Sequence, residues 1–499
     1  MNRYICIHGH FYQPPRENPW TNTIDTEPSA FPYGDWNQRI TAECYKPNLS
    51  ARIIDNKGNV IKRINNYTKI NFDFGPTLLA WLEKHEPDVY SAIIQSDHQS
   101  QKNFSGYGSA IAQVYNHIIM PLANEQDKRT QVIWGIKDFE YRFKRKPIGM
   151  WLSETAVDIP TLEILAENGI KFTILAPHQA KRIRKIGSKQ WIETNGNIDT
   201  KQVYLCQLPS GHTINIFFYD KTISADVAFN NLLSNGEIFA LRLVNAFIGN
   251  DASQLVHIAT DGETYGHHHR FGEMALAYCL DYIETNQLAQ LTNYSEFLAK
   301  HPASQEVEII ENTSWSCAHG LERWQSNCGC NTNCNPNWQQ NWRSPLRYAM
   351  NWLRDKIIEV LEPLANQYLK NLWQARNDYI DIILNPNPST IAQFVNKHCK
   401  QELSAQETVP MIKILETQYY ALLMFTSCGW YFDDISGLET IQILRYAGRA
   451  IQLTREITGI DLEPEYQKML ESAQSNISEY QNGSRVYEIF VKPYTKTNQ

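Results

Sequence analysis

The hydrophobic positions of the first 300 residues fall into short runs separated by stretches with helical periodicity. Strands joined by crossover helices produce this alternation in parallel sheets and in barrels. One unit is easy to follow. A predicted strand comes before Glu154, Asp158 and Pro160 then begin a helix, and Gly169 ends that helix. We therefore expect an α/β fold with functional residues at the carboxyl ends of its strands. The predicted strands are Tyr4–His8, Gly149–Leu152, Lys171–Leu175, Val203–Leu208, Ile214–Tyr219 and Leu255–Thr260, with a hairpin around Ser210-Gly211.

From about Pro345 onward, apolar residues recur at helical spacing over long stretches. A chain of 499 residues exceeds what one compact core usually holds, so this region is predicted to be a helical companion domain. The segment before it is rich in Cys, Asn and Trp and has little periodicity, which predicts a loop. The predicted helices are Leu346–Trp373, Val409–Phe425 and Leu438–Ile457.

Charge and composition exclude several classes of partner. The net charge is −7, whereas nucleic acid and anionic membranes require a concentrated basic face. The basic run Lys181–Lys185 is expected to be a solvated loop. No stretch approaches the roughly eighteen apolar residues of a membrane span, and residues 1–15 lack the pattern of a secretory signal. We therefore expect a cytoplasmic protein that binds neither nucleic acid nor membrane.

Two histidines lie at the end of the first predicted strand. His8 and His10 are two residues apart, so on an extended strand both point to the same face. Gln13 follows them, directly before two prolines. By itself, such a histidine pair is typical of a structural feature, of hydrogen bonding to a substrate or of part of a metal site.

Two carboxylates also follow predicted strands. Glu154 ends the run Trp-Leu-Ser-Glu, and Asp261 begins the run Asp-Gly-Glu. Cleavage of a glycosidic bond needs one carboxyl group to protonate the leaving oxygen and a second to act at the anomeric carbon. Their separation sets the stereochemistry, at about 5 Å for retention and more for inversion. This pair indicates glycosidic chemistry, and an aromatic share of 12% suits stacking against sugars.

The motifs His-x-His-x-x-Gln-Pro, Trp-Leu-Ser-Glu and Asp-Gly-Glu, in this order, resemble glycoside hydrolase family 57. The resemblance implies an incomplete (β/α)7-type barrel followed by a helical C-terminal domain. It also implies a retaining enzyme for α-linked glucans, with Glu154 as nucleophile, Asp261 as general acid/base, and no cofactor. The implied division is a catalytic barrel over residues 1–300, a loop region over the site at 301–345 and a helical domain over 346–490.

The resemblance extends to substrate-binding residues. It places His10 and His117 at the histidines of the family's first and second motifs, where they would bond sugar hydroxyls. Trp151 matches the tryptophan near the nucleophile, and Glu263 matches the acidic residue after the acid/base. The nearest counterpart of the fifth motif is Thr426–Asp434, in which Trp430 would stack on a sugar. The other residues expected to contact substrate are His8, Gln13, His267, His319, Trp324 and Trp342.

The ten cysteines do not form a disulfide framework, because six are scattered through mostly apolar segments. Cys317, Cys328, Cys330 and Cys334 instead crowd together with His319. Three interpretations remain open: a structural zinc site with His319, a redox-sensitive pair, or free thiols in a substrate-lining loop. Gaps of ten, one and three residues differ from the two-residue gap typical of zinc sites, so we expect no metal. The segment Ser314–Arg347 resembles a branch of the family with an extra C-terminal region.

The expected reaction is hydrolysis of α-1,4-linked glucan oligosaccharides or polysaccharides by double displacement. Asp261 must be protonated at rest, and both Glu154 and partial burial would raise its pKa. Glucan transfer or branching would use the same carboxylates. A zinc-dependent α-mannosidase or deacetylase would combine His8 or His10 with other ligands, and the cluster His267–His269 keeps this alternative open. The remaining alternative is a non-catalytic glucan-binding protein.

Overall fold

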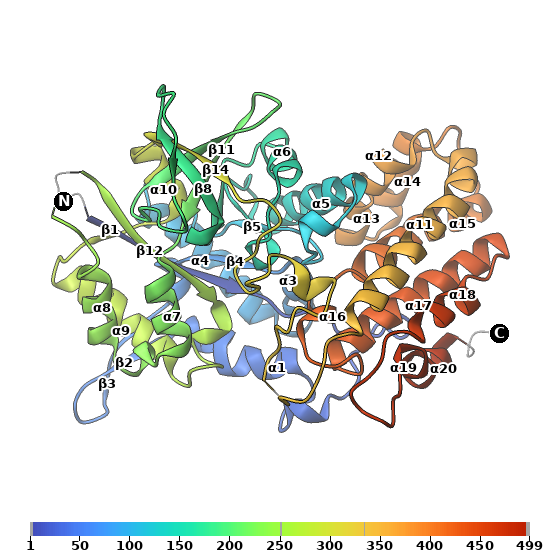
Figure 1. The fold of residues 1–499 in the computed structure, drawn as a ribbon, viewed down its shortest axis with the longest axis horizontal. Helices are drawn as coiled ribbons and strands as arrows, with labels where there is room; N and C mark the ends of the chain where they lie inside the picture. The colour runs from blue at the N-terminus through green and yellow to red at the C-terminus, as the bar shows by residue number, and fades with distance from the viewer. Residues whose placement is uncertain (1–2, 250–251, 334, 496–499) are drawn as a thin grey trace. The chain divides into compact units, whose positions relative to one another are not determined.

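The computed structural model describes residues 3–249, 252–333 and 335–495 (Figure 1). The chain divides into two compact units, each assembled from separate segments. The first unit contains the segment ending at Gln13 together with Thr26–Val114 and Phe139–Glu311. The second contains Pro14–Asp25, Tyr115–Asp138 and the segment beginning at Asn312. The boundary near residue 138 falls inside helix α5 (Glu125–Phe143).

The first strand is central to one sheet of the first unit. β1 (Arg3–Phe11) runs parallel to β12 (Gln254–Asp261), β4 (Asn71–Phe74) and β13 (Gln290–Leu291). Every residue of β1 after Arg3 is buried, as expected for a parallel strand covered on both faces. Short parallel strands β5 (Ala112–Gln113) and β6 (Met150–Trp151) pair with each other. Single bridges link Phe72 to Ala110 and Gly149 to Phe172.

A second sheet of this unit has six strands. Their order is β7 (Phe172–Leu175), β11 (Thr213–Phe218), β10 (Val203–Gln207), β14 (Gln305–Ile309), β8 (Ala180–Lys185) and β9 (Ile192–Glu193). The predicted hairpin is confirmed, because β10 and β11 are antiparallel and Gly211 between them has a φ of 89°. The separate strands β2 (Ala51–Ile54) and β3 (Val60–Ile64) form a two-stranded ribbon.

The basic run Lys181–Lys185 is a strand, so the prediction of a loop was wrong. It lies in β8, which is antiparallel to β14. The charged side chains are accommodated because Arg182 forms two hydrogen bonds with Glu308 across the strands, at 2.7 and 2.9 Å. A strand of basic residues therefore pairs with a strand that contains two glutamates.

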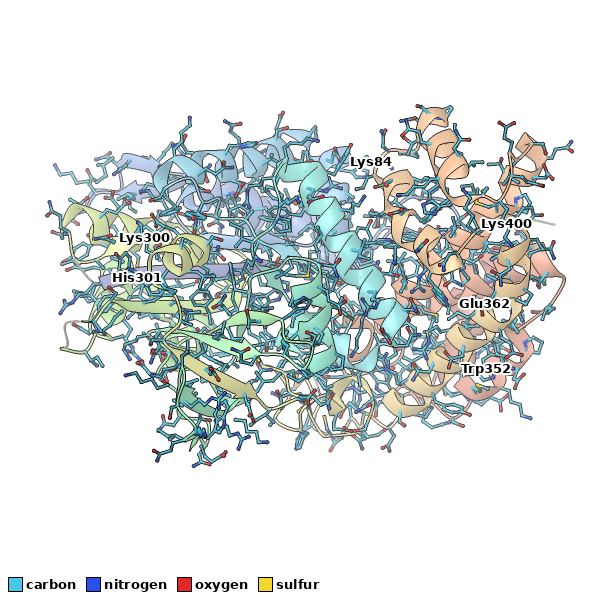
Figure 2. The ribbon with its side chains drawn as sticks, turned by 90° about the horizontal axis from the view of Figure 1, so that it is seen from above. Lys84, Lys300, His301, Trp352, Glu362 and Lys400 are labelled. Carbon is cyan, nitrogen blue, oxygen red and sulfur yellow. The ribbon has the colours of Figure 1, made fainter. Side chains whose placement is uncertain are left out.

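The helices of the first unit flank these strands. Helix α6 begins as predicted, since the side chain of Asp158 accepts a 2.9 Å hydrogen bond from the Thr161 amide, and Gly169 follows it at a φ of 85°. The helices are α1 (Trp36–Ile40), α2 (Lys46–Asn48), α3 (Pro76–His85), α4 (Pro87–Asn103), α6 (Ile159–Glu167), α7 (Lys221–Phe229), α8 (Gly236–Val244), α9 (Gly272–Thr285) and α10 (Tyr294–Lys300), the last marked by Lys300 and His301 in Figure 2.

The second unit is helical after Arg343. Buried residues of α11 (Arg343–Tyr368) recur every three or four positions, which aligns them on one side of the helix, and Figure 2 marks Trp352 and Glu362 along it. Leu369 ends this helix earlier than predicted. The others are α12 (Leu372–Asp378), α13 (Ile380–Leu384), α14 (Pro388–His398), α15 (Ala405–Leu423), α16 (Cys428–Tyr431), α17 (Leu438–Thr458), α18 (Glu463–Leu470), α19 (Gly483–Phe490) and α20 (Lys492–Thr495). Within the described ranges, no helix has the length and apolar character needed to cross a membrane.

Candidate active site

Two histidines and an aspartate form a buried polar group near the end of β1. The strand register places His8 opposite Asn71 and His10 opposite Asp73. His10 Nδ1 lies 2.8 Å from one carboxylate oxygen of Asp73, and His8 Nε2 lies 3.1 Å from the other. The two histidines therefore share one partner. Asp73 was not among the predicted residues, although Asn71-Phe-Asp-Phe alternates polar and aromatic residues as an amphipathic strand does.

This arrangement fixes the charges of the group. Burial alone would lower the pKa of His10, but the charge and hydrogen bond of Asp73, with Asp261 and Glu263, raise it to about 9. Burial alone would raise the pKa of Asp73, but its contacts with His10 and His8 lower it. At neutral pH, His10 is therefore a cation paired with the Asp73 carboxylate.

Trp151 packs against both histidines at the end of β6. Its ring centroid lies 4.9 Å from that of His8 and 5.0 Å from that of His10, at angles of 26° and 21° between the ring planes. Both Trp151 and His8 are fully buried. The Trp151 and His8 rings pack against each other away from the surface, and the predicted contact of Trp151 and His8 with substrate stays a prediction.

Glu154 lies just after Trp151, in a strained turn. Its φ is 58° and that of Thr155 is 51°, a left-handed conformation that costs non-glycine residues roughly 1–3 kcal/mol each. Gln179 holds the turn, because its side chain accepts a 2.9 Å hydrogen bond from Thr155 Oγ1 and donates one of 2.8 Å to the Thr155 carbonyl oxygen. The Glu154 side chain is partly exposed. Strain held in place beside an accessible carboxylate is typical of a functional residue.

Asp261 is the last residue of β12 and pairs with His10 in the register of β1. Its side chain is exposed, unlike those of its neighbours in the strand. The surrounding protein displaces water from the carboxyl group, and this desolvation raises the pKa of Asp261. The negative charge of Asp73 also raises this pKa, whereas the positive charge of His10 lowers it. Asp261 is thus an accessible carboxyl group with an increased tendency to hold a proton.

Glu263 follows Asp261 in a short 3₁₀ turn and is buried. One of its oxygens accepts hydrogen bonds from Tyr45 Oη at 2.6 Å and from the Tyr12 amide at 3.0 Å. Burial raises the pKa of Glu263 to about 7. The hydrogen bond from Tyr45 lowers this pKa, and the charge of Asp261 raises it. Glu263 therefore joins the segment after β1 to the segment after β12. Its contacts are internal, and Tyr45 was not predicted because it lies in an unrelated helical segment.

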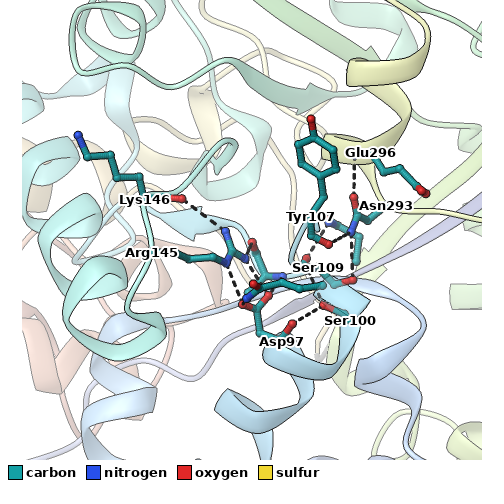
Figure 3. A network of polar contacts seen from close by, with 11 residues as sticks. Asp97, Ser100, Tyr107, Ser109, Arg145, Lys146, Asn293 and Glu296 are labelled. Atoms are coloured by element: carbon teal, nitrogen blue, oxygen red, sulfur yellow. Dashed lines mark hydrogen bonds and ion pairs between the residues drawn. The ribbon is translucent and has the colours of Figure 1, made fainter. Parts of the chain in front are cut away.

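A second polar network, drawn in Figure 3, surrounds Asp97, Ser109 and Arg145. Asn71 Oδ1 accepts a 2.7 Å hydrogen bond from His8 Nδ1, and Asn71 Nδ2 donates one of 2.7 Å to the Ser109 carbonyl oxygen. Arg145 forms two hydrogen bonds with the buried carboxylate of Asp97, at 2.8 and 2.7 Å. Asp97 also accepts a 2.8 Å hydrogen bond from the Ala110 amide. The backbone beside Ser109 is thereby fixed, and with it Asn71.

The three consecutive histidines do not converge. His267 pairs with Glu43, His269 Nε2 lies 2.9 Å from the Ala228 carbonyl oxygen, and burial lowers the pKa of His268 to about 4. Among the described residues, none of these histidines belongs to a group of three or more metal-ligand atoms close enough to share an ion. The alternative zinc hydrolase built on this cluster therefore finds no support in its geometry.

Further predicted residues are placed as follows. Gln13 ends a segment of the first unit, and its side chain donates a 3.0 Å hydrogen bond to the Tyr12 carbonyl oxygen. In the second unit, His117 has a φ of 52° and its Nδ1 lies 2.7 Å from Ser427 Oγ. A bridge pairs Ile118 with Thr426. The segment of His117 is thus joined to the segment that resembles the fifth motif.

The three tryptophans predicted to bind sugar in the second unit are fully buried: Trp324, Trp342 and Trp430. The Arg347 guanidinium lies 3.8 Å from the ring centroid of Trp430, whose Nε1 donates a 3.3 Å hydrogen bond to the Arg343 carbonyl oxygen. The ring of Trp430 has no exposed face in this structure, and its stacking on a sugar stays a prediction. The sequence did not reveal this, since aromatic residues in polar segments occur both in binding loops and in small buried cores.

Comparison with solved structures shows the same fold in several carbohydrate-active proteins. The exo-type maltose-forming amylase of Pyrococcus sp. ST04 aligns with a TM-score of 0.71 and 15% identity, over 99% of this chain and 93% of that chain. The GH57-type branching enzyme of Pyrococcus horikoshii aligns with a TM-score of 0.59 and 16% identity, over 100% and 98%. In sequence, α-amylase 1 of Dictyoglomus thermophilum is 28% identical over 106 residues, which are 21% of this chain and 15% of that protein.

Two family models match the sequence. Residues 338–499 match a domain of unknown function, DUF3536. Residues 11–310 match the model described as glycosyl hydrolase family 57. This region contains Asp73, the strained Glu154 turn and Asp261, whereas His8 and His10 lie directly before it. The match covers most of the chain, and the resemblance read from the three motifs is confirmed. The chain belongs to glycosyl hydrolase family 57.

Proposed function

We propose that this protein is a retaining glycoside hydrolase that cleaves α-1,4-linked glucans in the manner of an α-amylase, with Glu154 as nucleophile and Asp261 as general acid/base. The proposal depends on one observation: this member of the family has two carboxylates, Glu154 and Asp261, at the carboxyl ends of strands. Both are accessible, and both follow strands of the same unit. The similar proteins named above include amylases and a branching enzyme, which favours α-glucan as the substrate class.

The proposed roles follow from the surroundings of each carboxylate. Asp261 has a raised pKa, which favours the protonated form that a general acid needs before the first step. Glu154 is held by a turn whose strain is maintained through Gln179, and a nucleophile benefits from such a fixed position. His10, a cation beside Asp261, is suited to donate a hydrogen bond to a sugar hydroxyl or to an anionic carboxylate.

The reaction has two steps. In the first, Glu154 attacks the anomeric carbon, the glycosidic C–O bond breaks, and Asp261 gives its proton to the departing oxygen. In the second, the Asp261 carboxylate takes a proton from water, whose oxygen displaces Glu154 from the sugar. Asp261 ends protonated and Glu154 ends free, so the enzyme is regenerated and the anomeric configuration is retained.

We also propose that the strands around the site follow a seven-strand barrel path. Neighbouring strands along this path would be β12, β1, β4, β5, β6, β7 and β11. Ladders or single bridges support each step, and the Asp220 amide after β11 donates a 2.8 Å hydrogen bond to the His257 carbonyl oxygen of β12. The functional division proposed along the chain is a catalytic barrel at 1–300, a loop region over the site at 301–345 and a helical domain at 346–490.

The test is incubation of the wild type and Glu154→Gln with maltooligosaccharides and with amylose. Reducing ends, product sizes and the anomeric configuration of the first product are followed. A matched control is Glu167→Gln, because Glu167 is an exposed residue of the same type at the end of the following helix.

Three outcomes are informative. New reducing ends of retained configuration, lost in Glu154→Gln and kept in Glu167→Gln, support the proposal. Redistributed chain lengths without new reducing ends overturn hydrolysis in favour of transfer or branching. Binding without turnover in the wild type overturns the enzymatic proposal and supports a glucan-binding protein.

A further inference from the structure

Three thiols and one imidazole converge in the second unit, in a segment with little regular secondary structure. The four residues are Cys317, His319, Cys328 and Cys330, and one ligand atom of each lies within 4.8 Å of the others. The segment contains a single 3₁₀ turn, Glu322–Trp324. Cys317 is buried, and Cys328 and Cys330 are partly exposed. Cys334, the fourth cysteine of this part of the sequence, lies outside the described residues.

The distances within the cluster match the requirements of one tetrahedral ion. Cys317 Sγ lies 3.9 Å from Cys328 Sγ and 3.8 Å from Cys330 Sγ, and Cys330 Sγ lies 3.6 Å from His319 Nδ1. Around a tetrahedral zinc ion with Zn–S bonds of about 2.3 Å and a Zn–N bond of about 2.0 Å, sulfur atoms lie about 3.8 Å apart, and sulfur and nitrogen about 3.5 Å apart. In a disulfide the two sulfur atoms would be about 2.05 Å apart.

We propose that Cys317, His319, Cys328 and Cys330 bind one structural zinc ion. Four protein ligands complete a tetrahedral shell and leave no position for a substrate or a reactive water, which distinguishes a structural site from a catalytic one. The proposal revises the expectation of no metal. That expectation rested on sequence spacing, whereas the ligands come as two pairs, each with one intervening residue, brought together by the fold.

The surroundings of the cluster match its charge and connect it to neighbouring elements. Three thiolates and one Zn²⁺ have a net charge of −1. The Arg343 guanidinium lies beside the cluster, since its Nη1 donates a 2.8 Å hydrogen bond to the Cys330 carbonyl oxygen. Its Nη2 lies 3.3 Å from the carbonyl oxygens of Tyr431 and Phe432. Arg343 therefore joins the Cys317–Cys330 segment to the start of α11 and to the end of α16, and a zinc ion would hold that segment in the conformation that makes these contacts.

Neighbouring contacts extend the same attachment. Asp433 accepts hydrogen bonds from the Thr332 amide at 2.7 Å and from Thr332 Oγ1 at 2.8 Å. The Arg323 side chain donates a 3.1 Å hydrogen bond to the Ser316 carbonyl oxygen, and its guanidinium lies 3.8 Å from the ring centroid of Tyr431. Polar contacts thus flank the cluster on both sides, and the ion would supply the cross-link at its centre. This inference does not depend on the proposed glucan hydrolysis.

The test uses the full chain purified without chelator and analysed for zinc and iron by mass spectrometry. We expect one zinc ion per chain. Cys330→Ser and Cys328→Ser should lose it, whereas Cys428→Ser should keep it, because Cys428 is partly exposed in the same unit but lies outside the cluster. Zinc that is absent from the wild type after reconstitution under reducing conditions would overturn the proposal. Iron in place of zinc, or zinc that persists in both cluster variants, would also overturn it.

A second measurement tests the ligands even if the serine variants fail to fold. His319→Cys replaces one zinc ligand by another and should retain the ion. Cobalt added to metal-free wild-type protein should give the visible absorption of a tetrahedral thiolate site, and His319→Cys should increase its sulfur-to-metal charge-transfer band. A cobalt spectrum without thiolate bands, or one identical in His319→Cys, would contradict the assigned ligands.

Discussion

Replacement of Asp73 by Asn removes the negative charge between His8 and His10 while the shape of the side chain stays nearly the same. The pKa of His10 is about 9, compared with an ordinary value of 6.5. At about 1.4 kcal/mol per pKa unit, this difference corresponds to about 3.5 kcal/mol of folding free energy. This is a net value, because burial lowers the pKa of His10 while the charge and hydrogen bond of Asp73, together with Asp261 and Glu263, raise it.

The sign of the pH dependence follows from linkage. A histidine whose pKa is higher in the folded state than in the unfolded state stabilises the fold fully below the unfolded pKa of about 6.5. This contribution is lost as pH rises through the folded pKa of about 9. The stability difference between wild type and Asp73→Asn should therefore be largest near pH 6 and shrink towards pH 10.

The assay is thermal unfolding of both proteins between pH 6 and pH 10, in the same buffer series. A matched control is Asp281→Asn, since Asp281 forms its ion pair with Lys62 at the surface. The control should show a small difference that does not depend on histidine titration. A difference between wild type and Asp73→Asn that stays constant from pH 6 to pH 10 would refute the assignment of a charged His10–Asp73 pair.

Three further predictions concern the same unit. Asp97→Ala leaves the buried end of Arg145 without its carboxylate and should destabilise the fold by about 3–5 kcal/mol, measured by denaturant unfolding; a loss below 1 kcal/mol would contradict the role of this pair. Gly149→Ala would place a methyl group 2.3 Å from the Phe172 ring and should cost about 1–3 kcal/mol, visible as a lower melting temperature; an unchanged melting temperature would contradict this close packing. Asp261→Asn should reduce kcat about 10²–10⁴-fold and abolish the fall in activity at high pH that deprotonation of Asp261 produces in the wild type; an unchanged alkaline limb would exclude it as the acid.

Local signals in the sequence were sufficient for many of the elements and for the catalytic candidates. The strands before Glu154 and Asp261, the cap of α6 at Asp158 and the long helix after Arg343 depend on hydrophobic periodicity and on capping residues. These are interactions between residues a few positions apart, so the sequence alone reveals them. The motif order was likewise sufficient to identify the family.

Tertiary structure decided which side chains become partners across long separations. Asp73 meets His10 only because β1 and β4 are neighbours in the sheet, and β8 is a strand because Glu306 and Glu308 of β14 neutralise its arginines. Burial of Trp430 and convergence of the cysteines with His319 arise in the same way. The physical reason is that burial, charge pairing and metal geometry depend on distances in space, which the spacing of residues along a chain does not determine.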